Sequence, residues 1–280
     1  MNGPERAPAA GTLYVVSTPI GNLEDITLRA LRILREADIV AAEDTRHTAV
    51  LLRAHGIERR LLSYHEHNEA ARSRELLEQL KAGRSVAVVS DAGTPGVSDP
   101  AYRVVRAAID EGFPVVPVPG ASAVITALVL AGFPSAGFIS YGFLPQRGRA
   151  RREMIDRIVR EDRPSVFFES PRRVGRTLAD LAALAGSRAA AVLREMTKMH
   201  EEAHRGTLRE LAALFGEAPP RGEVVVVVSG VGRPEIELDL SPAALAERDR
   251  LIAGGLDEEE ATRRVVALYG AGRRRGPGGS

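Results

Sequence analysis

Short apolar runs alternate with helical patterns along residues 11–132, and this alternation constrains the fold more than any other feature. Each run is four to six residues long and leads through a short connection into a segment with helical periodicity. Strands and helices that alternate in this way form a mostly parallel, doubly wound sheet. The predicted strands are 13–17, 39–42, 61–64, 85–90 and 115–118.

A second α/β unit is predicted after the turn-forming residues 133–137. Its strands are expected at 138–141, 165–169, 189–194 and 223–229, with helices near 150–160, 172–184 and 207–215. Beyond residue 232 only helical patterns follow. The predicted parts are therefore an α/β domain at 11–132, a second at 137–232, a helical appendix at 240–270, and disordered ends at 1–10 and 271–280.

Composition excludes several classes of protein. The 280 residues contain no cysteine, so disulfides and thiolate chemistry are excluded. No apolar run is long enough to cross a membrane, and the first ten residues have no apolar signal core, so we expect a cytoplasmic protein without a membrane partner. The net charge is +1, from 38 basic and 37 acidic residues. Any surface that binds nucleic acid must therefore come from local clusters of basic residues rather than from the overall charge.

Three loops rich in glycine and proline follow strands of the first sheet, at 18–22, 91–99 and 119–123. Because the strands are parallel, the loops share the carboxyl edge, where such sheets bind ligands. Asp91 and Asp99 would repel phosphate and suit a ribose diol or a cation, both of which S-adenosylmethionine (SAM) offers. No Gly-Lys-Ser/Thr motif occurs, and no GxGxxG follows the first strand. Ordinary turn formation is the alternative interpretation.

Seven blocks of sequence follow one another in order over residues 11–230: 11–22, 43–46, 64–69, 90–95, 119–123, 142–145 and 194–202. Together they closely resemble the ribosomal RNA small subunit methyltransferase I family of the tetrapyrrole methylase superfamily. The resemblance implies a two-domain, class III SAM methyltransferase fold and 2′-O-methylation of a cytidine ribose in the decoding centre of 16S rRNA. It also implies the 30S subunit as partner and a homodimer.

The resemblance also implies which residues contact SAM. Asp91 and Asp99 are added by the charge argument above rather than by the family. The cofactor residues implied by the family are Pro19, Gly93, Thr94, Pro95, Ser122, Ala123 and Leu144.

Catalytic residues are expected after the 189–194 strand. Methyl transfer to a hydroxyl depends on alignment, and a base within reach can take the proton. Lys198 is one of only two lysines, and an ammonium can be deprotonated whereas a guanidinium cannot. Lys198, Glu195 and His200 are the candidate catalytic residues, with Glu201 as a further possible base; a plain surface lysine is the alternative for Lys198.

Two other clusters have a functional and a structural interpretation. His65 and His67 would share one face of a strand, but no third ligand is near, so no metal is predicted. These histidines and residues 43–46 either line the substrate cleft or form a hydrogen-bonded network. A set of arginines either contacts RNA phosphates or forms solvated helix faces: Arg147, Arg149, Arg151, Arg152, Arg157, Arg172, Arg173 and Arg176.

Three functions compete. The first is an RNA ribose methyltransferase, favoured by the arginines and by the 194–202 block. The second is a methylase of the same superfamily that acts on a tetrapyrrole or, like diphthine synthase, on a protein. The third is a ribosome-binding protein without catalysis, which SAM turnover on small-subunit RNA would rule out.

Overall fold

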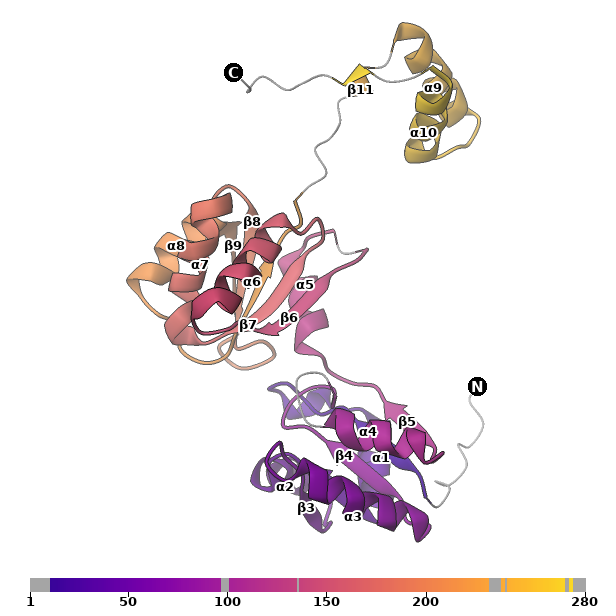
Figure 1. Ribbon diagram of the computed structural model, residues 1–280, viewed down its shortest axis with the longest axis vertical. Coiled ribbons are helices and arrows are strands. Elements are labelled where there is room, and N and C mark those ends of the chain that lie inside the picture. The colour runs from indigo at the N-terminus through magenta and orange to yellow at the C-terminus, as the bar shows by residue number, and fades with distance from the viewer. Residues whose placement is uncertain are drawn as a thin grey trace. The chain divides into compact units, whose positions relative to one another are not determined.

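The computed structural model describes residues 11–96, 101–134, 136–231, 238–239, 241–269 and 272–273 (Figure 1). The described residues up to Gly230 form one compact unit, and those from Val231 onward form another. The predicted disordered ends, 1–10 and 271–280, lie outside the described residues except for residues 272 and 273. The predicted domain boundaries stay a prediction. None of the helices in the described ranges is long and apolar enough to cross a membrane.

The first sheet contains five parallel strands in the order β3-β2-β4-β1-β5. The strands are β1 (Leu13–Val16), β2 (Ile39–Ala42), β3 (Leu61–Ser63), β4 (Val86–Val89) and β5 (Val115–Val118). Each predicted run forms a strand, and β4 is buried along its whole length because both faces of the sheet are covered. The predicted parallel sheet is confirmed.

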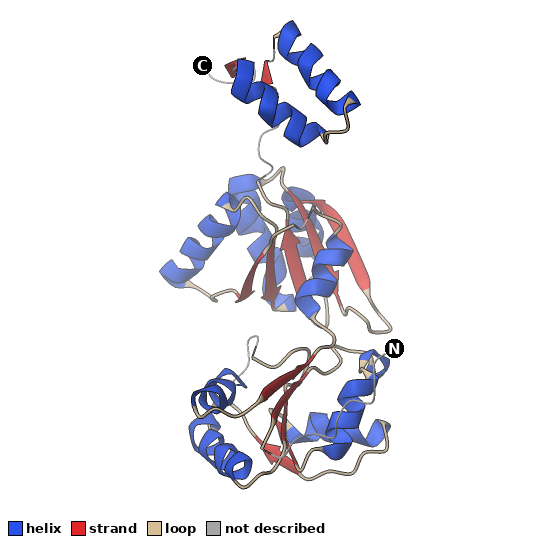
Figure 2. Ribbon diagram, turned by 90° about the vertical axis from the view of Figure 1, so that its right-hand side faces the viewer, coloured by secondary structure: helices blue, strands red, loops and turns tan. Residues whose placement is uncertain are grey.

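Helices cover both faces of this sheet (Figure 2). Residues of β1 and β4 alternate between two apolar clusters, one shared with α1 and α2 and the other with α3 and α4. Helix α1 leads from β1 toward one edge of the sheet, to β2, whereas α4 leads from β4 toward the other edge, to β5. The adjacent strands β1 and β4 therefore form a topological switch point. Ligands bind at such switch points. The helices are α1 (Leu28–Glu36), α2 (Thr45–Ala54), α3 (Glu69–Lys81) and α4 (Ala101–Asp110), with a 3-10 turn at Leu23–Asp25.

The second sheet is mixed, with the order β6-β7-β10-β8-β9. Only β6 and β7 are parallel; the other neighbours are antiparallel. Strand β9 was not predicted, because its sequence Glu-Ala-His-Arg-Gly-Thr has no alternating apolar residues and it lies at the edge of the sheet. The strands are β6 (Ile139–Phe143), β7 (Ser165–Glu169), β8 (Ala189–Arg194), β9 (Glu202–Thr207) and β10 (Val224–Val228).

One helix packs on one face of the second sheet and three on the other. Helix α5 (Ala123–Ala131) follows the last strand of the first sheet, yet its buried side chains pack against β7, β8 and β10. The opposite face packs against the helices α6 (Gly148–Arg160), α7 (Pro171–Ala185) and α8 (Leu208–Glu217). Pro171 begins α7, as predicted, because the first turn of a helix needs no N–H donor there.

The C-terminal unit contains two helices that pack on each other, α9 (Pro242–Ala253) and α10 (Glu258–Tyr269). A short two-stranded ladder, β11 (Leu238–Asp239) with β12 (Gly272–Arg273), was not predicted. Ser241 caps α9 by accepting a hydrogen bond from the Ala244 N–H at 3.3 Å. The two helices agree with the predicted helical appendix.

Candidate active site

The loops after β1 and β4 bind each other through their main chains. The N–H of Thr18 donates to the carbonyl of Gly93 at 2.9 Å, and the N–H of Gly93 donates back at 3.1 Å. The Thr18 hydroxyl also donates to the carbonyl of Ser90 at 3.1 Å. This pairing places two of the three predicted cofactor loops together at the switch point of the first sheet.

Two glycines permit the close approach of these loops. Gly93 has a φ of +77°, in the left-handed region that favours glycine. A Cβ on Gly120, in the loop after β5, would lie 2.8 Å from the Cβ of Ser17, closer than two side chains pack. The third predicted loop therefore meets the first where only a glycine fits.

The polar groups at this edge suit SAM better than a phosphate. The hydroxyls of Ser17 and Thr94 lie 3.0 Å apart, and the Ser122 hydroxyl caps α5. The loops at 17–22, 90–96 and 119–123 contain no lysine or arginine, whereas phosphate sites commonly add a basic side chain to main-chain donors. Hydroxyls, carbonyls and small residues fit a ribose, an adenine edge and an amino-acid tail.

The predicted cofactor residues differ in their exposure. Pro19 and Pro95 are buried, Thr94 is exposed, and Ala123 is the first residue of α5. Leu144 points into the core of the second sheet with α6 and α7, so its side chain cannot cover a ligand and only its main chain could contact one. Asp99 lies outside the described residues.

Asp91 has a structural partner. Its carboxylate accepts a hydrogen bond from the Asp44 N–H at 2.9 Å, which joins the loop after β4 to the start of α2. Asp44 in turn caps α2 and pairs with Arg46 at 2.7 Å; this guanidinium holds the pKa of Asp44 well below its usual range. Residues 43–46 therefore form a hydrogen-bonded network, one of the two interpretations of that block.

The second region of interest is the hairpin turn between β8 and β9, residues 195–201, which closes where Arg194 pairs with Glu202. Glu195 accepts the N–H of Glu223 at 2.8 Å and the Lys198 ammonium at 3.0 Å. Lys198 also reaches Glu223 at 3.1 Å. Gly222 has a φ of +85°, and a Cβ there would collide with the Glu195 carboxylate, so a side chain at this position would displace Glu195.

These contacts fix the ionisation of the pair. The hydrogen bond from Glu223, assisted by Lys198, lowers the pKa of Glu195. Burial alone would lower the pKa of Lys198, but the hydrogen bonds to Glu195 and Glu223 outweigh it and raise that pKa above 10.5. At neutral pH, Lys198 is therefore protonated and Glu195 ionised in this arrangement.

The turn is strained and touches the first cofactor loop. Glu195 and Thr197 have φ values of +49° and +68°, which are costly for residues with a Cβ, and most for a β-branched one. A Cβ on Gly21 would lie 2.6 Å from Cγ of Lys198 and 2.9 Å from Oγ1 of Thr197. The Gly21 loop and the hairpin turn thus pack directly against each other.

His200 is less fixed than the other two candidate catalytic residues. Its side chain is exposed, as is that of Met199. Glu201 accepts a hydrogen bond from the Thr197 N–H at 2.6 Å, so it supports the turn. The structure brings Glu195 and Lys198 together, whereas the side chain of His200 is exposed to solvent.

The arginines and histidines divide into structural and exposed groups. Arg151 is buried and pairs with Glu169 inside the protein, so for this residue neither a solvated helix face nor an RNA contact holds. Arg173 is half-buried and also pairs with Glu169. The expected strand at His65 and His67 is also wrong, because β3 ends at Ser63 and the histidines lie in a turn. Exposed arginines remain at Arg147, Arg149, Arg152, Arg157, Arg172 and Arg176.

Three residues of this region were missed from the sequence. Glu223 contributes a carboxylate to Lys198 from a distant segment, and no local pattern predicts that contact. Gly21 and Gly222 were available as glycines beside candidate loops, but the need for a missing Cβ depends on the tertiary approach of Lys198 and Glu195.

Comparison with known proteins defines the class. The family model "Tetrapyrrole (Corrin/Porphyrin) Methylases" matches residues 12–212. A uroporphyrin-III C-methyltransferase from Thermus thermophilus, solved in complex with S-adenosyl homocysteine, superposes with a TM-score of 0.55 at 20% identity, over 78% of this chain and 97% of that one. The fold and the matched region are those of a tetrapyrrole methylase, so the predicted fold class is confirmed.

Closer relatives define the family. "Ribosomal RNA small subunit methyltransferase I" of Halalkalibacterium halodurans is 43% identical over 267 residues, which cover 94% of this chain and 92% of the relative. The protein with the same name from Thermotoga maritima is 49% identical over 220 residues, which cover 79% of this chain and 99% of the relative. The chain belongs to the ribosomal RNA small subunit methyltransferase I family, and the predicted resemblance and enzyme class are confirmed.

Proposed function

We propose that this methyltransferase transfers a methyl group from SAM to the ribose 2′-hydroxyl of a cytidine in the decoding centre of 16S rRNA. The contact between the Gly21 loop and the Lys198 turn carries the proposal, because it puts a pair of titratable side chains next to the predicted cofactor loops. Family membership supports the rRNA substrate.

In the proposed reaction the main chain around Thr18, Gly93, Ser122 and Leu144 holds the cofactor, with Asp91 nearby. SAM supplies a methyl group on a positively charged sulfur, so alignment with the 2′-oxygen provides much of the acceleration. Lys198 and Glu195 act on the hydroxyl proton. Lys198 accepts that proton once its own has passed to solvent, which a guanidinium at this position could not do.

The proposed partner is 16S rRNA within the 30S subunit, and the proposed location is the cytoplasm. Exposed arginines on α6 and α7 support RNA contact, because they supply positive charge for phosphates. Arg149 pairs with Glu153 at 2.6 Å, so Arg147, Arg152 and Arg172 are stronger candidates for RNA phosphates. Raising the salt concentration should weaken RNA binding. The slope of the logarithm of the binding constant against the logarithm of the salt concentration should become smaller when these arginines are removed.

We also propose a homodimer. Helix α5 buries one side against the second sheet, but Ile125 and Val129 are exposed apolar residues one turn apart, with Val129 75% exposed. A second copy of the chain would remove this surface from water. Light scattering at micromolar concentration should give twice the chain mass, and Val129→Glu should give the monomer mass; a monomeric, fully active wild type contradicts the dimer.

Nucleoside mass spectrometry of 16S rRNA after incubation of 30S subunits with the protein and SAM tests the function. We expect one additional 2′-O-methylcytidine per rRNA molecule. A methyl group on a base, or methylation of a tetrapyrrole or a protein instead, would favour the other superfamily activities. SAM binding without turnover on any small-subunit RNA would favour a non-catalytic ribosome-binding role.

A further inference from the structure

A buried charged cluster lies at the end of β7, and one strand, β10, separates β7 from the strand β8 that leads into the Lys198 turn. Its centre is Glu169, whose side chain is 0% exposed. Val224 of β10 pairs with Glu169 on one side and with Arg194 on the other, so Glu169 lies at the same edge of the sheet as the turn. Neighbouring strands are about 4.8 Å apart, which separates Glu169 from Arg194 by roughly 10 Å.

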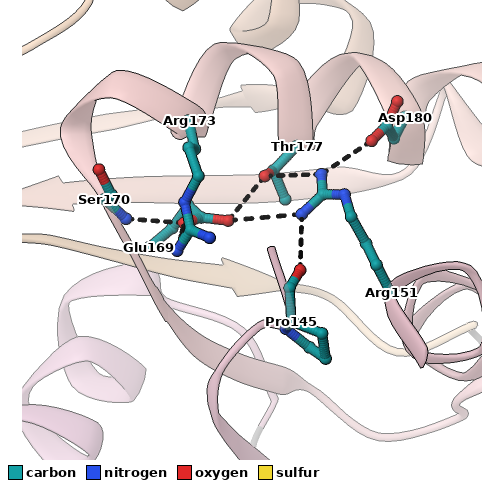
Figure 3. Close-up of polar contacts among 7 residues, drawn as sticks. All are labelled: Pro145, Arg151, Glu169, Ser170, Arg173, Thr177 and Asp180. Atoms are coloured by element: carbon teal, nitrogen blue, oxygen red, sulfur yellow. Dashed lines mark hydrogen bonds and ion pairs between the residues drawn. The ribbon is translucent and has the colours of Figure 1, made fainter. Parts of the chain in front are cut away.

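Both oxygens of Glu169 are bound (Figure 3). Oε1 accepts the N–H of Ser170 at 2.7 Å and pairs with Nη2 of Arg173 at 2.6 Å. Oε2 accepts the hydroxyl of Thr177 at 2.8 Å and lies 3.7 Å from Nη1 of Arg151. A buried carboxylate is costly unless it is paired in this way, so the cluster has one favoured geometry.

Arg151 connects this carboxylate to the connection between β6 and α6. Its side chain is 7% exposed; Nη2 donates to Thr177 at 3.0 Å and to Asp180 at 2.7 Å. Nη1 donates to the main-chain carbonyl of Pro145 at 3.4 Å. One guanidinium therefore links the end of β7, helix α7 and the residue that follows Leu144.

The connection between β6 and α6, which Arg151 contacts at Pro145, lies between two glycines with left-handed backbone. Gly142 and Gly148 have φ values of +63° and +84°, a conformation that favours glycine. Between them, Leu144 is buried in the core, whereas Phe143 just before it is 67% exposed. The Leu144 side chain and the Arg151 contact with Pro145 fix the path of the main chain past this exposed residue.

We propose that Arg151, itself oriented by Glu169, is a positioning residue for the cofactor. It holds the main chain of Leu144 and Pro145 in the path that contacts SAM, without touching SAM itself. This inference rests on the proposed function at one point, the cofactor contact of Leu144. Two arginines and two carboxylates balance in charge within the cluster, and apolar side chains of similar size would pack there without the pairing cost. Its charged members therefore serve geometry rather than stability.

The test compares Arg151→Lys with Arg149→Lys. A lysine keeps the charge near Glu169 but lacks the planar fork that reaches Pro145, Thr177 and Asp180 together. Arg149 lies on the same helix but is 88% exposed, so it is the matched control. Calorimetry measures the Kd for S-adenosyl homocysteine, and thermal melting confirms a folded state.

We expect Arg151→Lys to raise this Kd at least tenfold while the melting transition stays cooperative, and Arg149→Lys to leave it unchanged. Thr177→Val keeps both charges but removes the hydroxyl between Glu169 and Arg151, and it should also raise the Kd for S-adenosyl homocysteine. If Arg151→Lys does not fold, the Kd of Thr177→Val tests the proposal in its place.

Folded variants that bind S-adenosyl homocysteine within twofold of wild type, with only a lower melting temperature, would overturn the positioning role and leave a purely structural cluster. A wild-type protein that binds S-adenosyl homocysteine but methylates no rRNA would contradict the proposed substrate. The comparison of Kd values between Arg151→Lys and Arg149→Lys would still test the positioning role. The two failures are therefore distinguishable.

Discussion

The two sheets build their candidate functional edges in different ways. At the carboxyl edge of the first sheet, main-chain hydrogen bonds between Thr18 and Gly93 and the missing Cβ of Gly120 shape the site. At the matching region of the second sheet, the charged side chains of Glu195 and Lys198 shape a strained turn. A site built from main chain suits a cofactor that must be held the same way at each turnover, whereas titratable side chains suit proton transfer.

The largest expected effect is on the second edge. Lys198→Ala should lower the single-turnover rate at saturating SAM by about 100-fold or more, since general-base catalysis typically contributes 10²–10⁴-fold. Lys198→Arg should lower the rate nearly as much while keeping RNA affinity. Because its carboxylate partners raise the pKa of Lys198, the amine is scarce at neutral pH, and the wild-type rate should increase from pH 7 to pH 9.

Near-normal turnover with Lys198→Arg would instead make Lys198 a phosphate contact or a surface cation. The base would then be Glu195, His200 or Glu201, or alignment alone would suffice.

The next effect concerns the first edge. Gly93→Ala should raise the Kd for SAM about tenfold, because the added methyl group lies between the predicted cofactor loops, 3.6 Å from Ile20 and 3.7 Å from the Ala121 carbonyl, and strains the left-handed turn that joins them. Gly112→Ala is the matched control, since Gly112 has almost the same φ, +79°, and open space around it. Both variants should lose about 1–2 kcal/mol of folding free energy from the left-handed backbone. Equal SAM affinity in the two variants would contradict a cofactor role for Gly93.

A smaller effect should appear with pH. The folded-state pKa of Glu195 is lowered, so its contribution to stability is present above the unfolded pKa near 4.5 and is lost as pH falls through the folded value. The difference in melting temperature between wild type and Glu195→Gln should therefore be constant from pH 6 to 7 and shrink below pH 4.5. A difference that does not change with acidity would mean that Glu195 acts only through packing.

The smallest effect separates strain from stability. Thr197 combines a φ of +68° with a buried hydroxyl that has no hydrogen-bond partner among the described residues. Thr197→Gly removes both costs, so the melting temperature should stay the same or increase by a few degrees. The rate should decrease, because the turn that presents Lys198 becomes looser. A clear loss of stability would show that the side chain of Thr197 supports the turn.

The sequence predicted the first edge better than the second, for a physical reason. Glycine and proline after a buried parallel strand predict a ligand loop locally. The structure brings the predicted loops around Gly93 and Gly120 against the loop after β1, and their contact with a cofactor stays a prediction. The candidate catalytic residues were predicted to follow the 189–194 strand. The ion pair of Lys198 with Glu223 depends on the pairing of β8 with β10, which residue spacing does not reveal. The edge strand β9 was missed because it is polar.

The arginines show the same limit. The sequence placed Arg149 and Arg151 in one basic cluster, but Arg149 is exposed, whereas Arg151 pairs with the buried carboxylate of Glu169. Only the burial of Glu169, a tertiary property, distinguishes them. Leu144 was likewise assigned to the cofactor by resemblance, and its side chain belongs to the core.

The division of roles between the two edges is tested most directly by the single-turnover methylation rate of 30S subunits as a function of SAM concentration. Wild type, Gly93→Ala and Lys198→Ala are compared in one series. We predict that Gly93→Ala shifts half-saturation to higher SAM with a nearly unchanged plateau, and that Lys198→Ala keeps half-saturation while the plateau falls about 100-fold. If both variants change plateau and half-saturation together, the two edges do not divide binding from chemistry.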